Sequence, residues 1–288
     1  MPKYELIIDD KYDGIAVGKI IESKFKISAR LLSKLKNTDG IKLNGEHITV
    51  RGIAKKGDVL SLIMPNDKSE NIIPVNFPLD ILYEDDELLI VNKQRGMPTH
   101  PSLNNFDNTL GNAVMYYYKD IDFVYRPAIR LDKDTTGIVV IAKTPYAHHK
   151  ISLQLQNRTF DKKYLAICKN VPKDKEGIIN APIKREKESI IKRVVASDGQ
   201  EAITHYKVIK EKDNLALVEL ILKTGRTHQI RVHLAHIGCP LLYDYLYGEE
   251  EENKTFLLHC TQVSFIHPTT NKRLTINCLP PEEFDIIF

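Results

Sequence analysis

Two aspartates, Asp132 and Asp134, lie in the segment RLDKDTTG, residues 130 to 137, directly before an apolar run. An aspartate is ionised at neutral pH unless its surroundings disfavour the charge, so Asp132 could act as a nucleophile or as a base. The same composition is common in turns, where Asp and Thr side chains cap backbone amides and Gly137 would form the turn. Taken alone, this segment favours a turn, and a catalytic role needs support from elsewhere in the chain.

A second segment, TGRTHQIRVHLAHIGCPL at residues 224 to 241, carries the complementary charges. A strand that ends at Gly225 and a helix that begins near Thr227 would place Arg226, Thr227 and His228 beside free amides at a helix N-terminus. Such a terminus binds phosphates and other anions. Arg231 lies four residues beyond Thr227, on the same side as that terminus.

The histidines of this helix raise the hypothesis of a metal hydrolase. His233 and His236 are three residues apart on one helical face, and His228 precedes them. Metal sites of this kind also use carboxylate or cysteine ligands, and none stands on that face. The four cysteines are scattered without a C-x-x-C pair, so we expect them to pack as small apolar residues. The sequence therefore favours no metal, and the histidines are interpreted as packed or surface residues.

The elements that would position these segments alternate between strands and helices from residue 81 onwards. The expected strands cover residues 81–94 (a hairpin about Asp85-Asp86), 137–144, 161–169, 202–212, 214–224, 255–268 and 273–279. The expected helices cover residues 109–120, 145–158 and 226–238, the last closed by Gly238. This pattern predicts an α+β fold with a mixed, mainly antiparallel sheet.

The N-terminal quarter is more basic than the chain as a whole. Residues 19–56 contain ten Lys or Arg against three acids, although the net charge of the whole chain is only +3. Clustered cations are favoured on surfaces that bind phosphates, because binding releases counterions. This clustering predicts an RNA-binding surface, for which the candidate residues are Arg30, Lys34, Lys36 and Lys55.

The same quarter has the pattern of a small α+β module. Ser28 would cap a helix that Gly40 ends. Asn44-Gly45 is a strong two-residue hairpin signal, and a closing strand follows within residues 55–64. This order resembles the S-four-type RNA-binding domain, in which a short basic helix pair lies on RNA.

Composition indicates where the domains divide and in which compartment the protein is expected. Three prolines in polar company suggest a linker, so the domains predicted are a module at 1–65, a linker at 66–80 and a catalytic domain at 81–288. The N-terminus lacks the pattern of a signal peptide, and no apolar run approaches the ~18 residues of a membrane span. We therefore expect a cytoplasmic protein with no membrane partner, acting as a monomer.

Three motifs, RLDKDTTG, KKYLAI at residues 162–167 and TGRTHQIRVHLAHIGCPL, together resemble the RluA-like family of pseudouridine synthases in their order. These enzymes isomerise uridine to pseudouridine in ribosomal or transfer RNA. The later segments LLHC and FIHP also resemble signatures of that family. The resemblance covers roughly residues 80 to 288, and an S-four-type module in front is a common arrangement within the family.

The resemblance implies a role for each matching residue. Asp132 matches the essential catalytic aspartate. Arg130 matches the arginine that occupies the helical space left by the flipped uridine. Tyr164 matches the tyrosine that stacks on the base and serves as base for the carbon-five proton. Arg231 matches the arginine that pairs with the aspartate, and Ile230 an apolar wall of the uracil pocket. Arg226 and His228 complete the expected substrate-binding set.

The implied chemistry uses no metal and no organic cofactor. The bond between ribose and ring nitrogen must break, the base must rotate, and a bond to ring carbon five must form. Three paths stay open for Asp132: attack on the ribose, attack on the ring, or removal of a ribose proton to give a glycal. The expected partner is RNA, with ribosomal RNA favoured over transfer RNA.

The sequence departs from the family pattern at three positions. Ile129 stands where His is usual, Thr136 where Ser is usual, and Tyr243 where Gly is usual before Asp244, which predicts a reshaped loop near the site. Besides the metal hydrolase, the alternative is a non-catalytic RNA-binding or ribosome-assembly protein of the same fold. The joint presence of Asp132, Tyr164 and Arg231 favours the enzyme.

Overall fold

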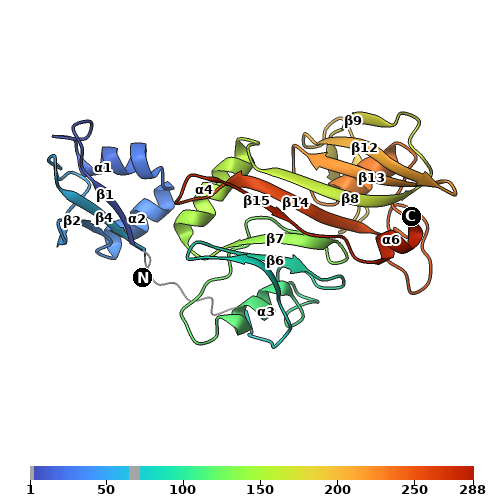
Figure 1. Ribbon diagram of the computed structural model, residues 1–288, viewed down its shortest axis with the longest axis horizontal. Helices are drawn as coiled ribbons and strands as arrows, with labels where there is room; N and C mark the ends of the chain where they lie inside the picture. The colour runs from blue at the N-terminus through green and yellow to red at the C-terminus, as the bar shows by residue number, and fades with distance from the viewer. Residues whose placement is uncertain (1–2, 65–71) are drawn as a thin grey trace.

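The computed structural model describes residues 3–64 and 72–288. Within these ranges the chain forms two parts, each with its own sheet and its own main apolar core. Figure 1 shows the smaller, N-terminal part at one end of an elongated molecule, with helix α4 (Pro145–Gln156) between it and the larger sheet. In the described residues, no helix combines the length and the apolar character that a membrane crossing requires.

The smaller part has a four-stranded antiparallel sheet in the order β1-β4-β2-β3. Its elements are β1 (Lys3–Ile7), α1 (Val17–Ile20), the π-helix η1 (Ile21–Phe25), α2 (Ala29–Asn37), β2 (Ile41–Leu43), β3 (Glu46–His47) and β4 (Val59–Ile63). The helix after Ser28, the hairpin at Asn44-Gly45 and the closing strand agree with the sequence prediction. Strand β1 and the helical turns before Ser28 were not predicted.

The end of α2 differs from the prediction. Ser28 caps the helix as expected, because its hydroxyl accepts a hydrogen bond from the Leu31 amide at 3.2 Å. The residue in the left-handed region is Asp39 (φ 52°), however, and not Gly40. Gly40 instead permits close packing, because an added Cβ would lie 2.7 Å from Leu35 Cδ2 and 2.8 Å from the Ile63 carbonyl oxygen.

The larger part confirms the predicted α+β class. Its nine-stranded sheet has the order β5-β6-β7-β14-β8-β13-β12-β9, with β15 paired to β14, and β7 with β14 is its one parallel pair among the described residues. Its strands are β5 (Asp80–Glu84), β6 (Leu88–Lys93), β7 (Thr136–Ala142), β8 (Asp161–Lys169), β9 (Glu176–Asn180), β12 (Ile203–Lys212), β13 (Leu215–Leu222), β14 (Leu258–Ile266) and β15 (Arg273–Asn277). Its helices are α3 (Leu110–Tyr117), α4, α5 (Gln229–His236) and α6 (Glu283–Ile287).

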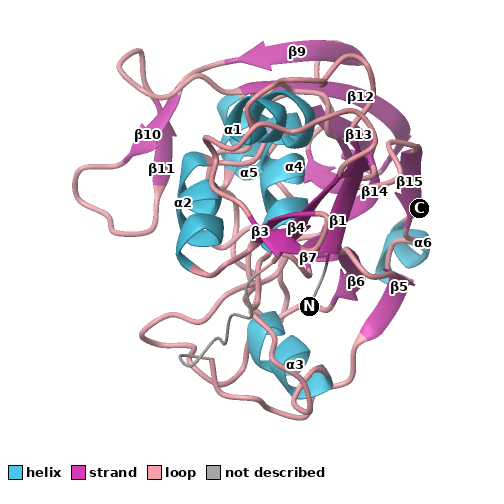
Figure 2. Cartoon of the chain, turned by 90° about the vertical axis from the view of Figure 1, so that its left-hand side faces the viewer, coloured by secondary structure: helices cyan, strands magenta, loops and turns pink. Residues whose placement is uncertain are grey.

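Two further strands, β10 (Ile183–Arg185) and β11 (Arg193–Val195), pair only with each other in the described sheets. Figure 2 shows this hairpin standing out from the rest of the molecule. The sequence did not predict β10 or β11, because three residues are too few to show a hydrophobic period. It also missed β9 and α6.

Gly137 lies inside β7 and does not form the turn that the sequence suggested. Its φ is 103°, and an added Cβ would meet the backbone of Cys260, 2.7 Å from the amide nitrogen. Strand β7 pairs with β14 at this residue. Glycine is therefore needed so that the two strands can approach each other directly after the Asp132 loop.

The two parts contact each other at the start of α4. The Tyr4 ring lies 4.3 Å from the Tyr146 ring, measured between centroids. The Tyr4 hydroxyl is hydrogen-bonded to the Thr144 hydroxyl at 3.0 Å, and Thr144 Oγ1 lies 2.8 Å from Glu87 Oε2. Tyr146 thereby belongs to the apolar core of the N-terminal part. This contact fixes the position of the small part relative to the large sheet.

Residues 66–71 of the predicted linker lie outside the described residues. After them, Ile72 is buried in the larger core, and the Ile73 carbonyl accepts a hydrogen bond from Asn112 Nδ2 at 2.8 Å. Part of the segment predicted as linker therefore packs against α3. The four cysteines are free and buried, as expected.

Candidate active site

One cavity of about 800 Å³ opens between the loop before β7, strand β8 and the start of α5. All seven residues that the sequence predicted for catalysis or substrate binding line this cavity: Arg130, Asp132, Tyr164, Arg226, His228, Ile230 and Arg231. These residues are up to 101 positions apart in the chain, so the fold brings the three motifs together.

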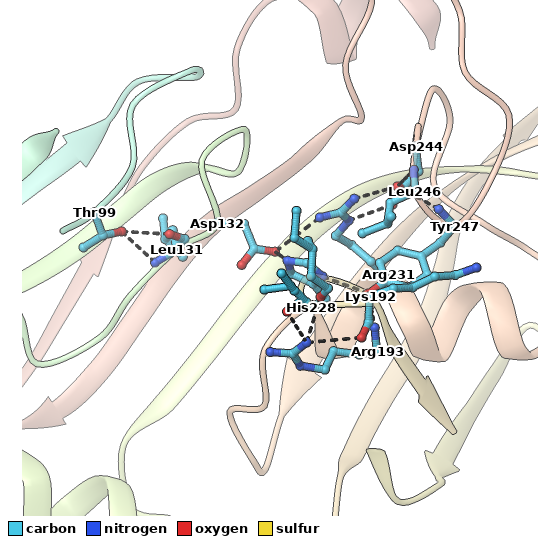
Figure 3. A network of polar contacts seen from close by, with 12 residues as sticks. Thr99, Leu131, Asp132, Lys192, Arg193, His228, Arg231, Asp244, Leu246 and Tyr247 are labelled. Atoms are coloured by element: carbon cyan, nitrogen blue, oxygen red, sulfur yellow. Dashed lines mark hydrogen bonds and ion pairs between the residues drawn. The ribbon is translucent and has the colours of Figure 1, made fainter. Parts of the chain in front are cut away.

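Asp132 is held from both sides through its neighbours' backbone. On one side, Thr99 Oγ1 accepts from the Leu131 amide at 3.0 Å and donates to the Leu131 carbonyl at 2.8 Å. On the other side, Lys93 Nζ donates to the Lys133 carbonyl at 2.9 Å. Figure 3 shows the first of these contacts. The position of the Asp132 carboxylate is thus set by a loop whose backbone is tied before and after it.

Lys93 is almost fully buried, at 1% exposure, and its ammonium group donates to the carbonyls of Gln94, Met97 and Lys133. Three acceptors use all three protons of the charged form. Burial lowers the pKa of Lys93 to about 7, although the nearby Asp134 and Asp132 oppose that shift. The sequence analysis did not single out Lys93. The signal was a lysine at the end of LLIVNK, on the same face of the strand as buried Leu89 and Val91.

Arg231 pairs more closely with Asp244 than with Asp132. Its Nε donates to Asp244 Oδ2 at 2.8 Å and its Nη2 to Oδ1 at 2.7 Å, the fork geometry that arginine forms with a carboxylate. Both side chains are buried, at 2% and 0% exposure. Burial disfavours the charge of Arg231, but Asp244 outweighs it and raises the pKa. The guanidinium also lies 4.3 Å from the centroid of the Phe256 ring.

The remaining donors of Arg231 face the predicted catalytic aspartate. Nη1 of Arg231 lies 3.8 Å from Asp132 Oδ2, and Nε2 of His228 lies 4.0 Å from the same oxygen. Figure 3 shows both side chains pointing toward Asp132 from α5 and its N-terminus. His228 is the N-cap of α5, with φ 57°, a left-handed conformation that non-glycine residues adopt rarely and often at functional sites.

Tyr164 lines the cavity from β8 and is buried, at 6% exposure. Burial, with smaller contributions from Cys260 and Asp132, raises the pKa of Tyr164 well above its ordinary value. The hydroxyl therefore keeps its proton at neutral pH. Lys162, two residues earlier on the same face of β8, is also buried and lines the cavity.

The start of α5 differs from the anion site that the sequence predicted. The Arg226 amide donates to Gln229 Oε1 at 3.0 Å and is not free, and Arg226 Nε donates to the Glu201 carbonyl at 2.9 Å. The sequence missed this because it could not show the side chain of Gln229 folding back over the terminus. Arg226 and His228 nevertheless present their side chains at the cavity wall.

His233 has packing partners of its own. Its Nδ1 lies 2.9 Å from Thr204 Oγ1, and its Nε2 lies 2.9 Å from the Ala181 carbonyl oxygen. Within residues 3–64 and 72–288, no three His, Cys, Asp or Glu side chains are grouped as metal ligands would be. These contacts favour the interpretation of His233 as a packed residue.

The three departures from the family pattern lie at or near the site. Ile129 is buried at the cavity wall. Thr136 Oγ1 lies 2.8 Å from Nδ1 of His259 and so has a partner. Tyr243 has φ 64°, the left-handed conformation that favours glycine. The reshaping of this loop stays a prediction.

Comparison with known proteins gives the fold and the family. The human RNA Pseudouridylate Synthase Domain Containing 1 has the same fold, with a TM-score of 0.61 and 24% identity over 73% of this chain and 87% of that one. The sequence profile of a family described as RNA pseudouridylate synthase matches residues 87–236. The chain belongs to this family, and it is an isomerase that converts uridine in RNA to pseudouridine.

Similar curated proteins extend over nearly the whole chain. The uncharacterized RNA pseudouridine synthase YjbO of Bacillus subtilis is 38% identical over 89% of this chain and 93% of its own length. The ribosomal large subunit pseudouridine synthase D of Zymomonas mobilis is 33% identical over 100% of this chain and 97% of its own. The family assignment confirms the prediction from the three motifs and favours the enzyme over both alternatives.

Proposed function

We propose that this enzyme modifies uridines in ribosomal RNA, and that Asp132 is the catalytic carboxylate acting on a uridine flipped out of its stack. The observation that carries the proposal is the carboxylate of Asp132 in the cavity, faced by Arg231 and His228 at 3.8 and 4.0 Å. Relatives named as ribosomal large subunit synthases, which include one from Pasteurella multocida at 36% identity, support the choice of ribosomal RNA.

The reaction needs a charged carboxylate beside the sugar. The bond between ribose carbon one and ring nitrogen one breaks, the base rotates, and carbon five bonds to the ribose and loses its proton. Attack on the ribose, attack on the ring and removal of a ribose proton all begin with ionised Asp132. The positive charge of Arg231, itself fixed by Asp244, faces the Asp132 carboxylate and orients it.

Tyr164 supplies a flat face for the detached base and a hydroxyl for proton transfer. Aromatic rings stack on flipped bases in enzymes of this kind. Because its pKa is raised, Tyr164 is not a resting phenolate. It therefore accepts the proton from carbon five only as it gives its own away, and the proton lost by carbon five is balanced by the one that ring nitrogen one gains in the product. Ile230, buried at the cavity wall, forms an apolar side of the same pocket.

Flipping a uridine leaves a gap in the RNA helix. Arg130 is exposed at the mouth of the cavity, two residues before Asp132. We assign it to the vacated space, where its guanidinium stacks on the neighbouring bases and replaces part of the lost stacking energy. Arg226, exposed beside the same cavity, is assigned to the RNA backbone.

The N-terminal part is assigned to RNA binding as an S-four-type module. Arg30 and Lys36 are exposed on α2, and Lys55 is exposed in the loop before β4, while Lys34 is half-buried. The docking of this part on α4 keeps these cations at a fixed distance from the cavity. They therefore bind phosphates of the same RNA that presents the target uridine.

Mapping of pseudouridine by chemical marking and sequencing tests the choice of RNA. Cells that lack the gene should lose pseudouridine at specific positions of ribosomal RNA, and the wild-type gene should restore it. The Asp132→Asn gene should restore none. Loss of pseudouridine confined to transfer RNA would overturn the proposed substrate.

A further inference from the structure

A chain of polar contacts runs from the β10–β11 hairpin to the catalytic aspartate (Figure 3). The backbone N–H of Arg193, at the start of β11, donates to the hydroxyl oxygen of Tyr247 at 2.9 Å. The same oxygen lies 2.8 Å from Nδ1 of His228. On the far side of the imidazole, Nε2 faces Asp132 Oδ2 at 4.0 Å.

The first contact decides the direction of the others. A backbone N–H can only donate, so Tyr247 accepts from Arg193 and keeps its own proton for another partner. Nδ1 of His228 is the acceptor within reach, and an imidazole that accepts at Nδ1 carries its proton on Nε2. In the opposite tautomer, Tyr247 would accept twice, and its own proton would have no acceptor among the hydrogen bonds found in the described residues.

The electrostatic surroundings agree with this assignment. Burial raises the pKa of Tyr247 to about 12, so its hydroxyl is a reliable donor at neutral pH. Burial also lowers the pKa of His228, although Asp132 opposes the shift, so the imidazole is neutral and has two tautomers to choose from. The left-handed backbone of His228 directs its ring between Tyr247 and Asp132.

We propose that Tyr247 is a positioning residue that holds His228 in the tautomer protonated on Nε2, so that this N–H donates to Oδ2 of Asp132 when uridine fills the cavity. The inference rests on the proposed function, in which Asp132 is the catalytic carboxylate. Arg231 Nη1 approaches the same oxygen at 3.8 Å. The two donors together hold Oδ2 and leave Oδ1 to face the substrate. Catalytic hydrogen bonds of this length commonly tighten when substrate binds.

Loss of the Tyr247 hydroxyl removes this control. The ring would remain in place, because it packs over the Arg231 guanidinium at 5.0 Å from its centroid. His228 would then also populate the other tautomer, which turns the lone pair of Nε2 toward the negative carboxylate. Asp132 would lose one of its two donors and part of its orientation, while the surface that binds RNA would not change.

Kinetics of Tyr247→Phe with tritium-labelled RNA test the proposal. We expect kcat to fall by about tenfold, the effect of weakening one hydrogen bond to a charged group, with RNA affinity unchanged. The matched control is Tyr243→Phe, in the same loop, whose hydroxyl accepts from Lys254 at the surface and not from the chain to His228. Its kcat should equal that of the wild type.

A double variant that includes His228→Gln distinguishes control of the His228 tautomer from a general packing role of Tyr247. In His228→Gln, an amide N–H lies at about the reach of Nε2 and has no tautomer to set. Adding Tyr247→Phe to this variant should cause no further loss of kcat. In protein labelled with ¹⁵N-histidine, NMR should show His228 protonated on Nε2 in the wild type and a mixture of tautomers in Tyr247→Phe.

Three results would overturn the inference while leaving the proposed function standing. The first is wild-type kcat in Tyr247→Phe when Asp132→Asn is inactive. The second is an equal loss of kcat from Tyr247→Phe in the His228→Gln background. The third is a wild-type His228 protonated on Nδ1. Activity retained by Asp132→Asn would instead overturn the proposed function itself.

Discussion

The two parts of the molecule place their charges in opposite ways. In the N-terminal part, Lys36 and Lys55 are exposed. In the larger part, two cations that support the Asp132 loop and carboxylate are buried, Lys93 at 1% and Arg231 at 2% exposure, and they bond to carbonyls and to Asp244. In the proposed function, the first arrangement supplies an affinity for phosphates that salt weakens, and the second fixes the geometry of the Asp132 carboxylate.

The difference has an energetic consequence. An exposed charge contributes little to stability, and its pairs are worth about 0 to 1 kcal/mol. A buried pair that loses one partner destabilises the fold by about 3 to 5 kcal/mol, because a charge is left without compensation. Substitutions in the two parts should therefore differ in kind: those in the small part change binding, and those around the cavity change both folding and catalysis.

The largest effect is expected for Asp244→Asn. This change keeps the shape but leaves buried Arg231 without its ion-pair partner, so the free energy of unfolding should fall by about 3 to 5 kcal/mol, measured in urea. Activity should fall as well, because Arg231 no longer holds a fixed position beside Asp132. Glu211→Gln, which removes an exposed pair with Lys175, should change stability by less than about 1 kcal/mol. Equal losses of unfolding free energy in Asp244→Asn and Glu211→Gln would contradict the expected difference between buried and exposed ion pairs.

A smaller effect is expected when charges of the N-terminal part are reversed. Reversal is preferable to deletion, because deletion would expose Tyr146 and break the contact of Tyr4 with Thr144. The double variant Lys36→Glu, Lys55→Glu should bind RNA more weakly, with a slope of log affinity against log salt shallower by about 0.9 per lost phosphate contact. Its rate at saturating RNA should be close to that of the wild type.

The matched control reverses Lys173 and Lys210, which are also exposed but lie in the larger part. The total change of charge is the same, so a non-specific effect of net charge would weaken both double variants alike. We expect the control to keep the wild-type affinity to within about twofold and the wild-type salt slope. Equal losses in both variants would contradict the RNA-binding role of the N-terminal part.

The smallest effect expected is a pH dependence set by Lys93. Burial lowers its pKa from 10.5 to about 7, so the folded protein releases this proton before the unfolded chain does. Its contribution to the free energy of unfolding should therefore rise with pH between about 7 and 10.5. Activity should change in the opposite direction, because a neutral amine has two protons for three carbonyls.

The profile of kcat against pH checks this prediction. The wild type should lose activity as pH rises through about 7, and Lys93→Met should be less active throughout and lack that step. Circular dichroism of the variant shows whether it is folded. An unchanged step in folded Lys93→Met would assign the titration to another group.

The sequence predicted much of the site because its motifs are local. Asp132, Tyr164 and Arg231 each lie in a short segment whose order is typical of the family, and the fold class followed from hydrophobic periods. The supports of the site were not predictable in this way. Thr99 and Lys93 reach the Asp132 loop across 32 and 40 residues, through the pairing of β6 with β7. Tyr247 reaches His228 only because the following loop folds back over α5.

The most direct test of the whole account measures release of tritium from RNA labelled at carbon five of uridine. The wild type should release it, since the new bond to carbon five displaces that proton. Asp132→Asn should bind the same RNA with similar affinity and release essentially none, because the charged carboxylate is lost while the cavity and the exposed cations of the N-terminal part remain. Release by Asp132→Asn at a rate near that of the wild type would contradict the central role of Asp132.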